Sequence, residues 1–337
     1  MVYTFGLVKH TNIRYRDSLN RLSRYELVSM LHSLSVTCPV ECEEIGGASF
    51  LTFSCRELSR DELSFLSGHS AVVFMAEKTE SGLLRPLDAD RIGYLEEDLP
   101  EILKYKGKTS PSFLRLMINV AQSLSAFSAE KSPLTVLDPL CGKGTTCFCA
   151  LQAGMNAIGL DLDKKAVHEA ADYFSRYLKV HMLKHSFTAS SLTAGKESVP
   201  VSDYVFADTK EHFRDKEVRT LRLAECDTAL TPVVCRRMPA HLLVTDLPYG
   251  IQHAPRDGRK TESFTEMLCR ALPQWKKAVC PGGVAAVSFN TLTLPAKQVF
   301  EISRSAGWTP VEHDSCLHFR HEVEQAVVRD VVFMIHN

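Results

Sequence analysis

The stretch Val136-Leu-Asp-Pro-Leu-Cys-Gly-Lys-Gly-Thr-Thr146 decides the fold of this chain. An apolar run, the pattern of a buried strand, ends at Asp138 and continues through Gly142 and Gly144 into a helical segment. Glycines in such a turn let the backbone approach a ligand closely. A nicotinamide fingerprint would need a third glycine where Cys147 stands, and a Walker A loop would need Ser or Thr directly after its lysine. Both phosphate-binding interpretations are therefore weakened.

Strands and helices alternate on either side of this turn, which is typical of a doubly wound, Rossmann-like α/β sheet with helices on both faces. We expect this fold, with an open parallel sheet, over residues 110–337. The segment at about 179–216 fits no element well, apart from a possible short strand near Tyr204, and is expected to be an insertion. The predicted helices are 112–127, 145–152, 164–177 and 261–279, and the predicted strands are 134–137, 157–161, 221–226, 242–246, 284–289 and 327–335.

The first 78 residues have a different pattern. Gly46-Gly47 joins two short strands and is a strong hairpin signal. The resulting order β-α-β-β-α-β predicts a small α+β module of the ferredoxin-like type over residues 1–78. Residues 79–109 are rich in Gly and Pro and are expected to form a linker. The predicted strands of the module are 2–8, 40–45, 49–53 and 71–76, and its predicted helices are 19–34 and 60–66.

Composition limits the classes of protein to consider. With 337 residues, 45% hydrophobic and 23% charged, the chain has the make-up of a folded protein long enough for two domains. Its net charge of -1 excludes a global basic field. Neither a long apolar run nor an export signal is evident, so we expect a cytoplasmic protein without a membrane span.

The 11 cysteines do not predict disulfides or zinc. Their number is odd and they lack paired Cys-x2-Cys knuckles, so we expect reduced thiols and no bound metal. The best counter-candidate for a metal site has no regular ligand spacing, and surface or core histidines explain it more simply. It consists of His313, Cys316, His318 and His321.

Carboxylates follow several of the predicted strands. Asp138 would repel a pyrophosphate but would attract an ammonium or sulfonium group, as in S-adenosylmethionine. Asp161 ends the next strand, where acidic side chains hydrogen-bond ribose hydroxyls in doubly wound nucleoside binders. Asp163 is better placed to cap the helix that follows it. Asp227 follows a later strand and could accept a hydrogen bond from an adenine amino group or equally cap a loop.

A second polar turn follows the strand that ends in Asp246-Leu-Pro-Tyr249. Asp246 and the carbonyl of Leu247, held out by Pro248, can accept hydrogen bonds from an exocyclic amine, while Tyr249 can stack on a planar base. Two such acceptors would draw the amine hydrogens away from the ring plane and free the nitrogen lone pair for attack on a methyl group. An ordinary strand-end turn containing Pro and Gly is the alternative.

Together, segment 138–146, the Gly159-Leu-Asp161 turn and Asp246-Leu-Pro-Tyr249 resemble the class I S-adenosylmethionine-dependent amino-methyltransferases. Within them they are similar to the tRNA guanine-N2 methyltransferases, the THUMP-associated RNA methylases. Similarity extends to 103–109 and to Arg329-Asp330, so it covers roughly residues 100 to 337. It implies a class I methyltransferase domain over 110–337 with S-adenosylmethionine as the cofactor.

The resemblance also implies roles for individual residues. The family more commonly has proline where Leu247 stands, but the required group is a backbone carbonyl. The family's ferredoxin-like module is usually joined to a THUMP domain, and the N-terminal segment leaves little room for both. The implied catalytic residues are Asp246, Leu247, Pro248 and Tyr249, and the implied cofactor contacts are Asp138, Pro139, Cys141, Gly142, Gly144, Thr145, Asp161, Leu162, Asp227 and Thr228.

Basic residues near these turns are candidates for RNA contacts, although charge runs are usually solvated faces. They are Arg256, Arg259 and Lys260 after the second turn, and Lys106 and Lys108 in the linker. We therefore expect methylation of an exocyclic nucleobase amine in RNA, with guanine N2 of tRNA as the first choice. Open alternatives are adenine-N6 or cytosine-N4 methylation of DNA or RNA, glutamine methylation in a protein, and a non-catalytic cofactor-binding protein. A partner subunit also stays open.

Overall fold

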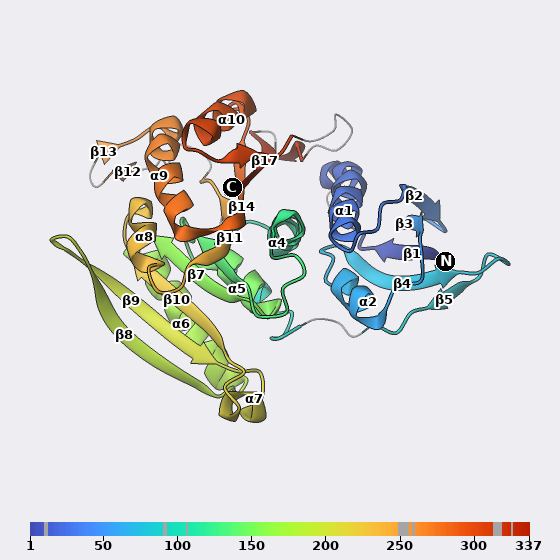
Figure 1. Cartoon of the computed structure of the whole chain (residues 1–337), viewed down its shortest axis with the longest axis horizontal. Coiled ribbons are helices and arrows are strands. Elements are labelled where there is room, and N and C mark those ends of the chain that lie inside the picture. Colours follow the sequence, from blue (N-terminus) through green and yellow to red (C-terminus); the bar gives the residue numbers. More distant parts are fainter. Residues whose placement is uncertain are drawn as a thin grey trace.

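The computed structural model describes residues 1–9, 13–89, 93–105, 107–248, 256–257, 260–312, 319–324 and 326–337. These residues form a five-stranded N-terminal sheet and a ten-stranded sheet in the rest of the chain. Figure 1 shows the N-terminal module in blue beside the larger sheet, with one helix, α4 (Pro111–Leu124), between the two parts. The expected α/β fold with a small α+β module is confirmed.

The N-terminal module has the predicted β-α-β-β-α-β order, and its antiparallel strands lie in the order β2-β3-β1-β4-β5. Gly46 and Gly47 both have positive φ, at 60° and 80°, as a two-residue hairpin turn requires. The last strand falls inside the predicted linker and extends the sheet. The elements are β1 (Val2–Leu7), α1 (Ile13–Ser33), β2 (Val40–Ile45), β3 (Ala48–Ser54), α2 (Arg60–Ser67), β4 (Val72–Lys78) and β5 (Leu84–Pro86).

The larger sheet has the strand order β15-β17-β14-β11-β6-β7-β10-β9-β8, and β16 pairs with β17. The five central strands, from β14 to β10 in this order, pair in parallel, but both outer parts are antiparallel. The expectation of an open parallel sheet is thus right for the centre and wrong for the edges. The strands are β6 (Thr135–Asp138), β7 (Asn156–Asp161), β8 (His185–Ala194), β9 (Glu197–Phe206), β10 (Arg219–Glu225), β11 (Ala240–Asp246), β14 (Val279–Asn290), β15 (Thr309–Pro310), β16 (His321–Glu324) and β17 (Val327–Ile335).

Strands β8 and β9 occupy much of residues 179–216, where the sequence predicted an insertion with only a possible short strand near Tyr204, a residue that lies in β9. They form a long hairpin around Gly195, whose φ is +62°, and β9 pairs with β10. Half of the side chains of β8 are exposed Ser and Thr, whereas β9 buries Val199 and Val201. Because one strand carries little apolar signal, the alternation was too weak to identify the hairpin from sequence.

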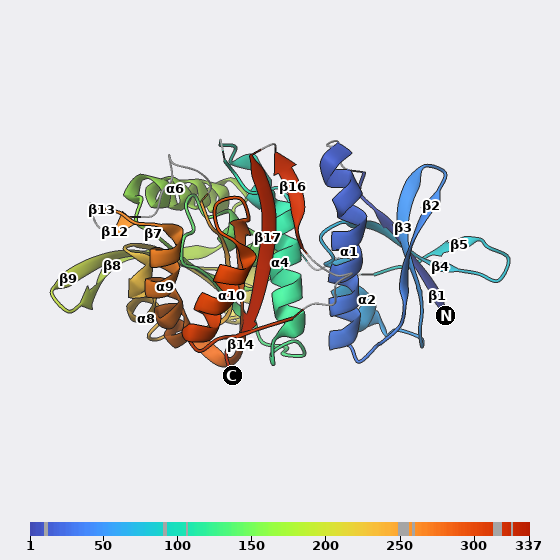
Figure 2. The ribbon, with the colours of Figure 1, turned by 90° about the horizontal axis from the view of Figure 1, so that it is seen from above.

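Helices cover both faces of the larger sheet (Figure 2). One buried cluster joins α4 and α5 to the N-terminal module, and a second lies under α9 and α10. Helix α4 is buried nearly all round because α1 packs on one side of it and the sheet on the other. The helices are α3 (Leu99–Ile102), α5 (Thr145–Gln152), α6 (Lys164–Val180), α7 (Lys210–Arg214), η1 (Thr228–Leu230), α8 (Thr231–Val234), α9 (Phe264–Ala278) and α10 (Ala296–Ser305), and β12 (Arg256–Asp257) pairs with β13 (Lys260–Thr261).

Candidate functional site

The chain reverses its direction across the sheet between the neighbouring strands β6 and β11. From β6 it continues to β7 and β10, and from β11 it continues to β14. Ligands of open α/β sheets bind beyond the carboxyl ends of the strands at such a switch point. Asp138, Asp161 and Asp246 are the last residues of β6, β7 and β11, so the fold brings these three predicted site residues to one edge.

Asp138 is 3% exposed, and the hydrogen-bond partners that the described residues give it are neutral donors. Thr245 Oγ1 donates to Asp138 Oδ1 at 2.8 Å, and the Leu140 N–H donates to the same oxygen at 3.1 Å. Burial raises the pKa of Asp138 to about 6, although hydrogen bonds from Thr146, Thr245 and Leu140 favour the charged form. A cation placed beside this carboxylate would therefore gain a strong electrostatic interaction.

Asp161 connects two backbone segments at the same edge. Its Oδ2 accepts the Gly142 N–H at 2.7 Å, and its Oδ1 accepts the Asp163 N–H at 2.8 Å. Burial raises the pKa of Asp161 as well. Asp163 caps α6 by accepting from Lys165 and Ala166, as the sequence predicted. Asp161 thus fixes the glycine turn, and its ribose role stays a prediction.

The two glycines of the turn have different surroundings. Both have left-handed φ, 50° for Gly142 and 83° for Gly144. A Cβ on Gly144 would lie 3.2 Å from the Phe148 ring, whereas a Cβ on Gly142 would meet nothing within 4 Å. Gly144 therefore allows close packing within the fold, and Gly142 leaves open space beside Asp161 that a ligand can occupy.

Other predicted cofactor residues have side chains that the fold already uses. Cys141 and Pro139 are buried, and the Cys141 Sγ packs against Gly159. Thr145 shares a hydrogen bond with the Tyr105 hydroxyl at 2.8 Å. These residues can offer a ligand backbone groups more readily than side chains.

The predicted adenine side of the site is partly occupied by protein partners. Thr228 is 5% exposed and its hydroxyl accepts from Trp275 Nε1 at 2.8 Å. Asp227 caps η1 and forms an ion pair with Arg270. Leu162 is 42% exposed, so it offers an apolar surface beyond β7. Adenine recognition by Asp227 stays a prediction, and it would have to share that carboxylate with Arg270.

The second turn places Asp246 in a charged setting. The Asp246 Oδ2 accepts a hydrogen bond from the Thr109 hydroxyl and lies 3.4 Å from Arg329 Nη2. The side chains of Asp246 and Arg329 are 9% and 7% exposed. The Leu247 N–H donates to the Ser288 carbonyl at 2.9 Å, which ties the turn to β14. Pro248 is half-buried, and Tyr249 lies outside the described residues.

Thr109 and Arg329 were not recognised from sequence as partners of Asp246. A single arginine in the apolar run of β17 is the signal that could have found one of them, because a buried guanidinium needs an anionic partner. Thr109 gives no comparable signal. Its hydroxyl reaches Asp246 only because the end of the predicted linker returns to the sheet edge.

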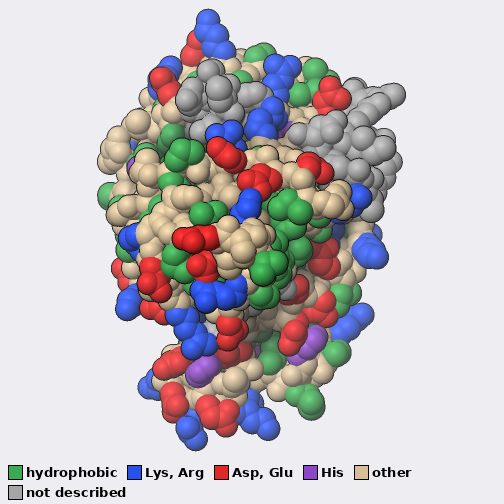
Figure 3. Space-filling view, turned by 90° about the vertical axis from the view of Figure 1, so that its right-hand side faces the viewer, with side chains coloured by type: hydrophobic (Ala, Val, Ile, Leu, Met, Phe, Trp, Pro, Cys, Tyr) green, Lys and Arg blue, Asp and Glu red, His purple; other side chains and the backbone are tan. Residues whose placement is uncertain are grey.

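The structure gives little support to the predicted RNA contacts. Lys108 donates to the carbonyls of Pro100 and Glu101, so its ammonium group supports the fold of the linker. Arg256 and Lys260 belong to the β12–β13 hairpin, of which only the backbone is described, and Lys106 and Arg259 lie outside the described residues. On the face shown in Figure 3, basic and acidic side chains are interspersed.

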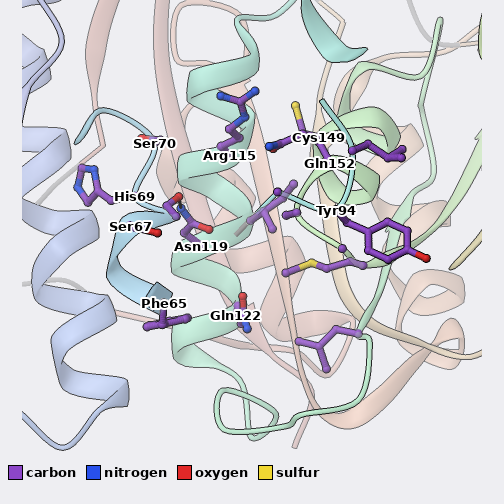
Figure 4. A pocket seen from close by; sticks show the side chains of 18 of the residues that line it. Phe65, Ser67, His69, Ser70, Tyr94, Arg115, Asn119, Gln122, Cys149 and Gln152 are labelled. Atoms are coloured by element: carbon purple, nitrogen blue, oxygen red, sulfur yellow. Dashed lines mark hydrogen bonds between the residues drawn. The ribbon is translucent and has the colours of Figure 1, made fainter. Parts of the chain in front are cut away.

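A cavity of about 1470 Å³ lies between the N-terminal module and α4 (Figure 4). It is lined by His69 and Ser70 from the module, Asn119 from α4 and Tyr94 from the linker. Its walls also include Leu134, which precedes β6, so it reaches the amino ends of the strands. It is therefore separate from the edge that carries the three aspartates.

The described residues offer neither a metal-binding cluster nor a membrane-spanning helix. The described part of the chain contains no group of three or more His, Cys, Asp or Glu side chains arranged to hold a metal ion. Of the counter-candidate residues, His321 is a buried residue of β16, and the other three lie outside the described residues. Within the same described ranges, every helix is too short or too polar to cross a membrane.

No protein-family model and no curated protein match the sequence. Among solved structures, TrmN from Thermus thermophilus has 15% identity and a TM-score of 0.41, and the match covers 89% of this chain and 60% of that one. The magnesium protoporphyrin IX methyltransferase of Synechocystis, solved with S-adenosylmethionine bound, has 14% identity and a TM-score of 0.38, covering 68% of this chain and 87% of the other. An N-methyltransferase, NodS from Bradyrhizobium japonicum, has 11% identity and a TM-score of 0.38, covering 67% and 94%.

The second and third of these neighbours are methyltransferases by name. The chain spans 60% of the length of TrmN.

Proposed function

We propose that this chain is an S-adenosylmethionine-dependent N-methyltransferase that acts on an exocyclic nucleobase amine in RNA, with guanine N2 of tRNA as the first substrate to test. One observation carries the proposal. Asp138, Asp161 and Asp246 end strands beside the switch point of a doubly wound sheet; among the described residues, Asp246 pairs with a buried arginine, whereas Asp138 accepts from a hydroxyl and a backbone N–H. The proposed catalytic domain is 110–337, preceded by a module at 1–78 and a linker at 79–109.

The cofactor fits the residues beside β6 and β7. Asp138 is a buried carboxylate with neutral donors, which suits a ligand that brings its own positive charge. Gly142 leaves open space next to Asp161, whose oxygens can also accept from ribose hydroxyls. S-adenosylmethionine, when bound, supplies a methyl group activated by a sulfonium centre.

The residues after β11 suit the acceptor amine. Asp246, already paired with Arg329, can accept a hydrogen bond from a neutral amine without bringing an uncompensated charge into a buried site. The carbonyl of Leu247 supplies a second acceptor, and the N–H of the same residue is fixed by Ser288. With both amine hydrogens held, the nitrogen lone pair is no longer delocalised into the ring and can point toward the methyl group.

The motif order and the planar-base stacking expected of Tyr249 support a nucleobase rather than an amide side chain. Base stacking on aromatic rings is the usual way in which proteins hold unpaired RNA bases. Guanine, adenine and cytosine all present an exocyclic amine, so the choice among them is the part of the proposal that most needs an experiment.

Nucleoside mass spectrometry tests the proposal directly. Small RNA from cells lacking this gene would be incubated with the purified protein and S-adenosylmethionine, with Asp246→Ala as the control. We expect a new N2-methylguanosine peak that the variant does not produce. A methyladenosine or N4-methylcytosine peak would show that adenine or cytosine, rather than guanine, is the substrate. If cofactor binds but no nucleoside changes, RNA is wrong as the free substrate, and DNA, protein glutamine and a missing partner subunit are tested next.

A further inference from the structure

Arg329 is held in a tight environment beside Asp246. Its guanidinium lies 4.6 Å from the centre of the Phe113 ring on α4 and 3.4 Å from Asp246 Oδ2. Both charged side chains are nearly inaccessible to solvent. A planar guanidinium between a ring face and a carboxylate has few alternative positions, so its placement limits where the carboxylate can lie.

Strand β16 lies beside Arg329 because it pairs with β17. His321 is the cross-strand partner of Arg329, and its ring lies 5.2 Å from the same Phe113 ring. The His321 Nδ1 is 2.6 Å from the Phe319 carbonyl. Burial, together with the nearby cations Arg329 and Arg21, lowers the pKa of His321 to about 4. The imidazole is therefore neutral near pH 7 and fills the space beside Arg329 without adding a second cation.

The N-terminal module contacts the strand β16 and the residues just before it. Arg21 Nη2 donates to the Arg320 carbonyl at 2.5 Å, and the Tyr25 ring packs edge-on against Phe319 with centroids 4.5 Å apart. Arg21 and Tyr25 lie one turn apart on α1, which faces α4 and β16 (Figure 2). A continuous series of contacts therefore runs from the module through β16 to Arg329 and Asp246.

We infer that the N-terminal module positions the catalytic carboxylate: α1 holds β16, and β16 holds Arg329 against Asp246. Arg329 is the positioning residue of this arrangement. The inference rests on the proposed function where it calls Asp246 catalytic. The coupling between α1 and residues 243–248, the end of β11 and the turn after it, can be tested without any substrate.

Plain domain packing is the competing explanation. The same module also contacts α4 through a buried polar group away from β16, in which Asn119 Nδ2 donates to Glu26 Oε1 at 2.7 Å and to the Gly68 carbonyl at 2.9 Å. If the module merely packs, loosening either contact should have the same result at the catalytic turn. If the inference is right, only the contact with β16 matters there.

Hydrogen–deuterium exchange of the whole protein distinguishes the two explanations. The variants are Tyr25→Ala and, in case it fails to fold, Arg21→Met, with Asn119→Ala as the matched control that loosens the module elsewhere. We expect faster exchange in β16 and in residues 243–248 for the first two variants, and no change at 243–248 for the control. The inference is wrong if 243–248 is unaffected in Tyr25→Ala and Arg21→Met, or if Asn119→Ala has an equal effect.

Turnover provides the catalytic readout. In Arg329→Gln we expect kcat to fall by about a hundredfold, the loss that a misplacement of about 1 Å can cause, with unchanged cofactor affinity. Arg329→Lys should recover part of the loss because it restores the charge. Equal losses in the Gln and Lys variants, or a matching loss of cofactor affinity, would show a structural role only.

The two measurements separate the two proposals. If the wild-type protein transfers no methyl group to RNA, the proposed function fails while the exchange experiment still decides the link from α1 to the turn. If methyl transfer occurs but exchange at 243–248 does not respond to the α1 variants, the proposed function stands and the further inference is overturned.

Discussion

Asp138 and Asp246 end neighbouring strands of one sheet, are both nearly buried, and differ in what the protein places beside them. Asp138 receives hydrogen bonds from a hydroxyl and a backbone N–H, and burial raises its pKa to about 6. Asp246 receives a hydroxyl and the guanidinium of Arg329. A carboxylate whose described partners are neutral donors suits a charged ligand, and a neutralised carboxylate suits a neutral amine. The same residue type can therefore serve two different ligands within one site.

The largest effect that would test this contrast is the loss of Asp246. Asp246→Ala should lower methyl transfer by about a thousandfold, as the removal of one transition-state hydrogen-bonding group can do, because the amine loses an acceptor. Cofactor affinity, measured by titration calorimetry, should change little. An equal loss of cofactor binding would show that Asp246 does not belong to the acceptor side.

Removal of the charge at Asp138 should have the reverse pattern. In Asp138→Asn we expect cofactor affinity to fall between about tenfold and a hundredfold, the range for a hydrogen bond to a charged group. Turnover at saturating cofactor should be much less affected than in Asp246→Ala. The proposed difference between Asp138 and Asp246 is wrong if Asp138→Asn binds S-adenosylmethionine as tightly as the wild type.

Acidification should separate the two carboxylates without any substitution. Below a pKa of about 6, Asp138 becomes protonated and loses its attraction for a cationic cofactor, so affinity should fall as pH falls from 7 to 5. The slope should not exceed about tenfold per pH unit for one proton. Calorimetry across this range measures it, and Asp138→Asn should flatten the curve. A slope that persists in that variant would assign the titration to another group.

The smallest effects should come from the two threonines that donate to the two carboxylates. Thr245→Val removes a donor from Asp138 and Thr109→Val removes one from Asp246, each at nearly constant side-chain volume. Each should cost about 1 kcal/mol, or roughly fivefold. We expect Thr245→Val to weaken cofactor binding and Thr109→Val to lower kcat. The same kinetic defect in both variants would mean that the two halves of the site are not separable.

The parts of the fold that were predictable from sequence depend on local signals. The glycine turn after β6, the cap at Asp163 and the Gly46-Gly47 hairpin each follow from residues adjacent in the chain. The hairpin β8–β9 was missed because exposed serines and threonines give β8 no clear alternation. Antiparallel strands at the sheet edges were missed for a related reason, since strand direction is set by long-range pairing that periodicity does not report.

The candidate site likewise has a part that was predictable from sequence and a part that was not. The carboxylates at strand ends were identifiable because each follows an apolar run. The pairing of Asp246 with Arg329 spans 83 residues, and that with Thr109 spans 137, so neither has a signature in any local window. The engagement of Asp227 by Arg270 and of Lys108 by linker carbonyls likewise appears only once the chain is folded.

The position of α4 between the two sheets has a consequence for how the protein unfolds. One apolar cluster runs from β1 through α1 and α4 to β6, so the two sheets share this hydrophobic core. Removing the N-terminal module would expose the outer side of α4 to water. Melting of the two parts should consequently be coupled into a single calorimetric transition, and a truncated chain starting at the linker should aggregate rather than persist as a folded domain.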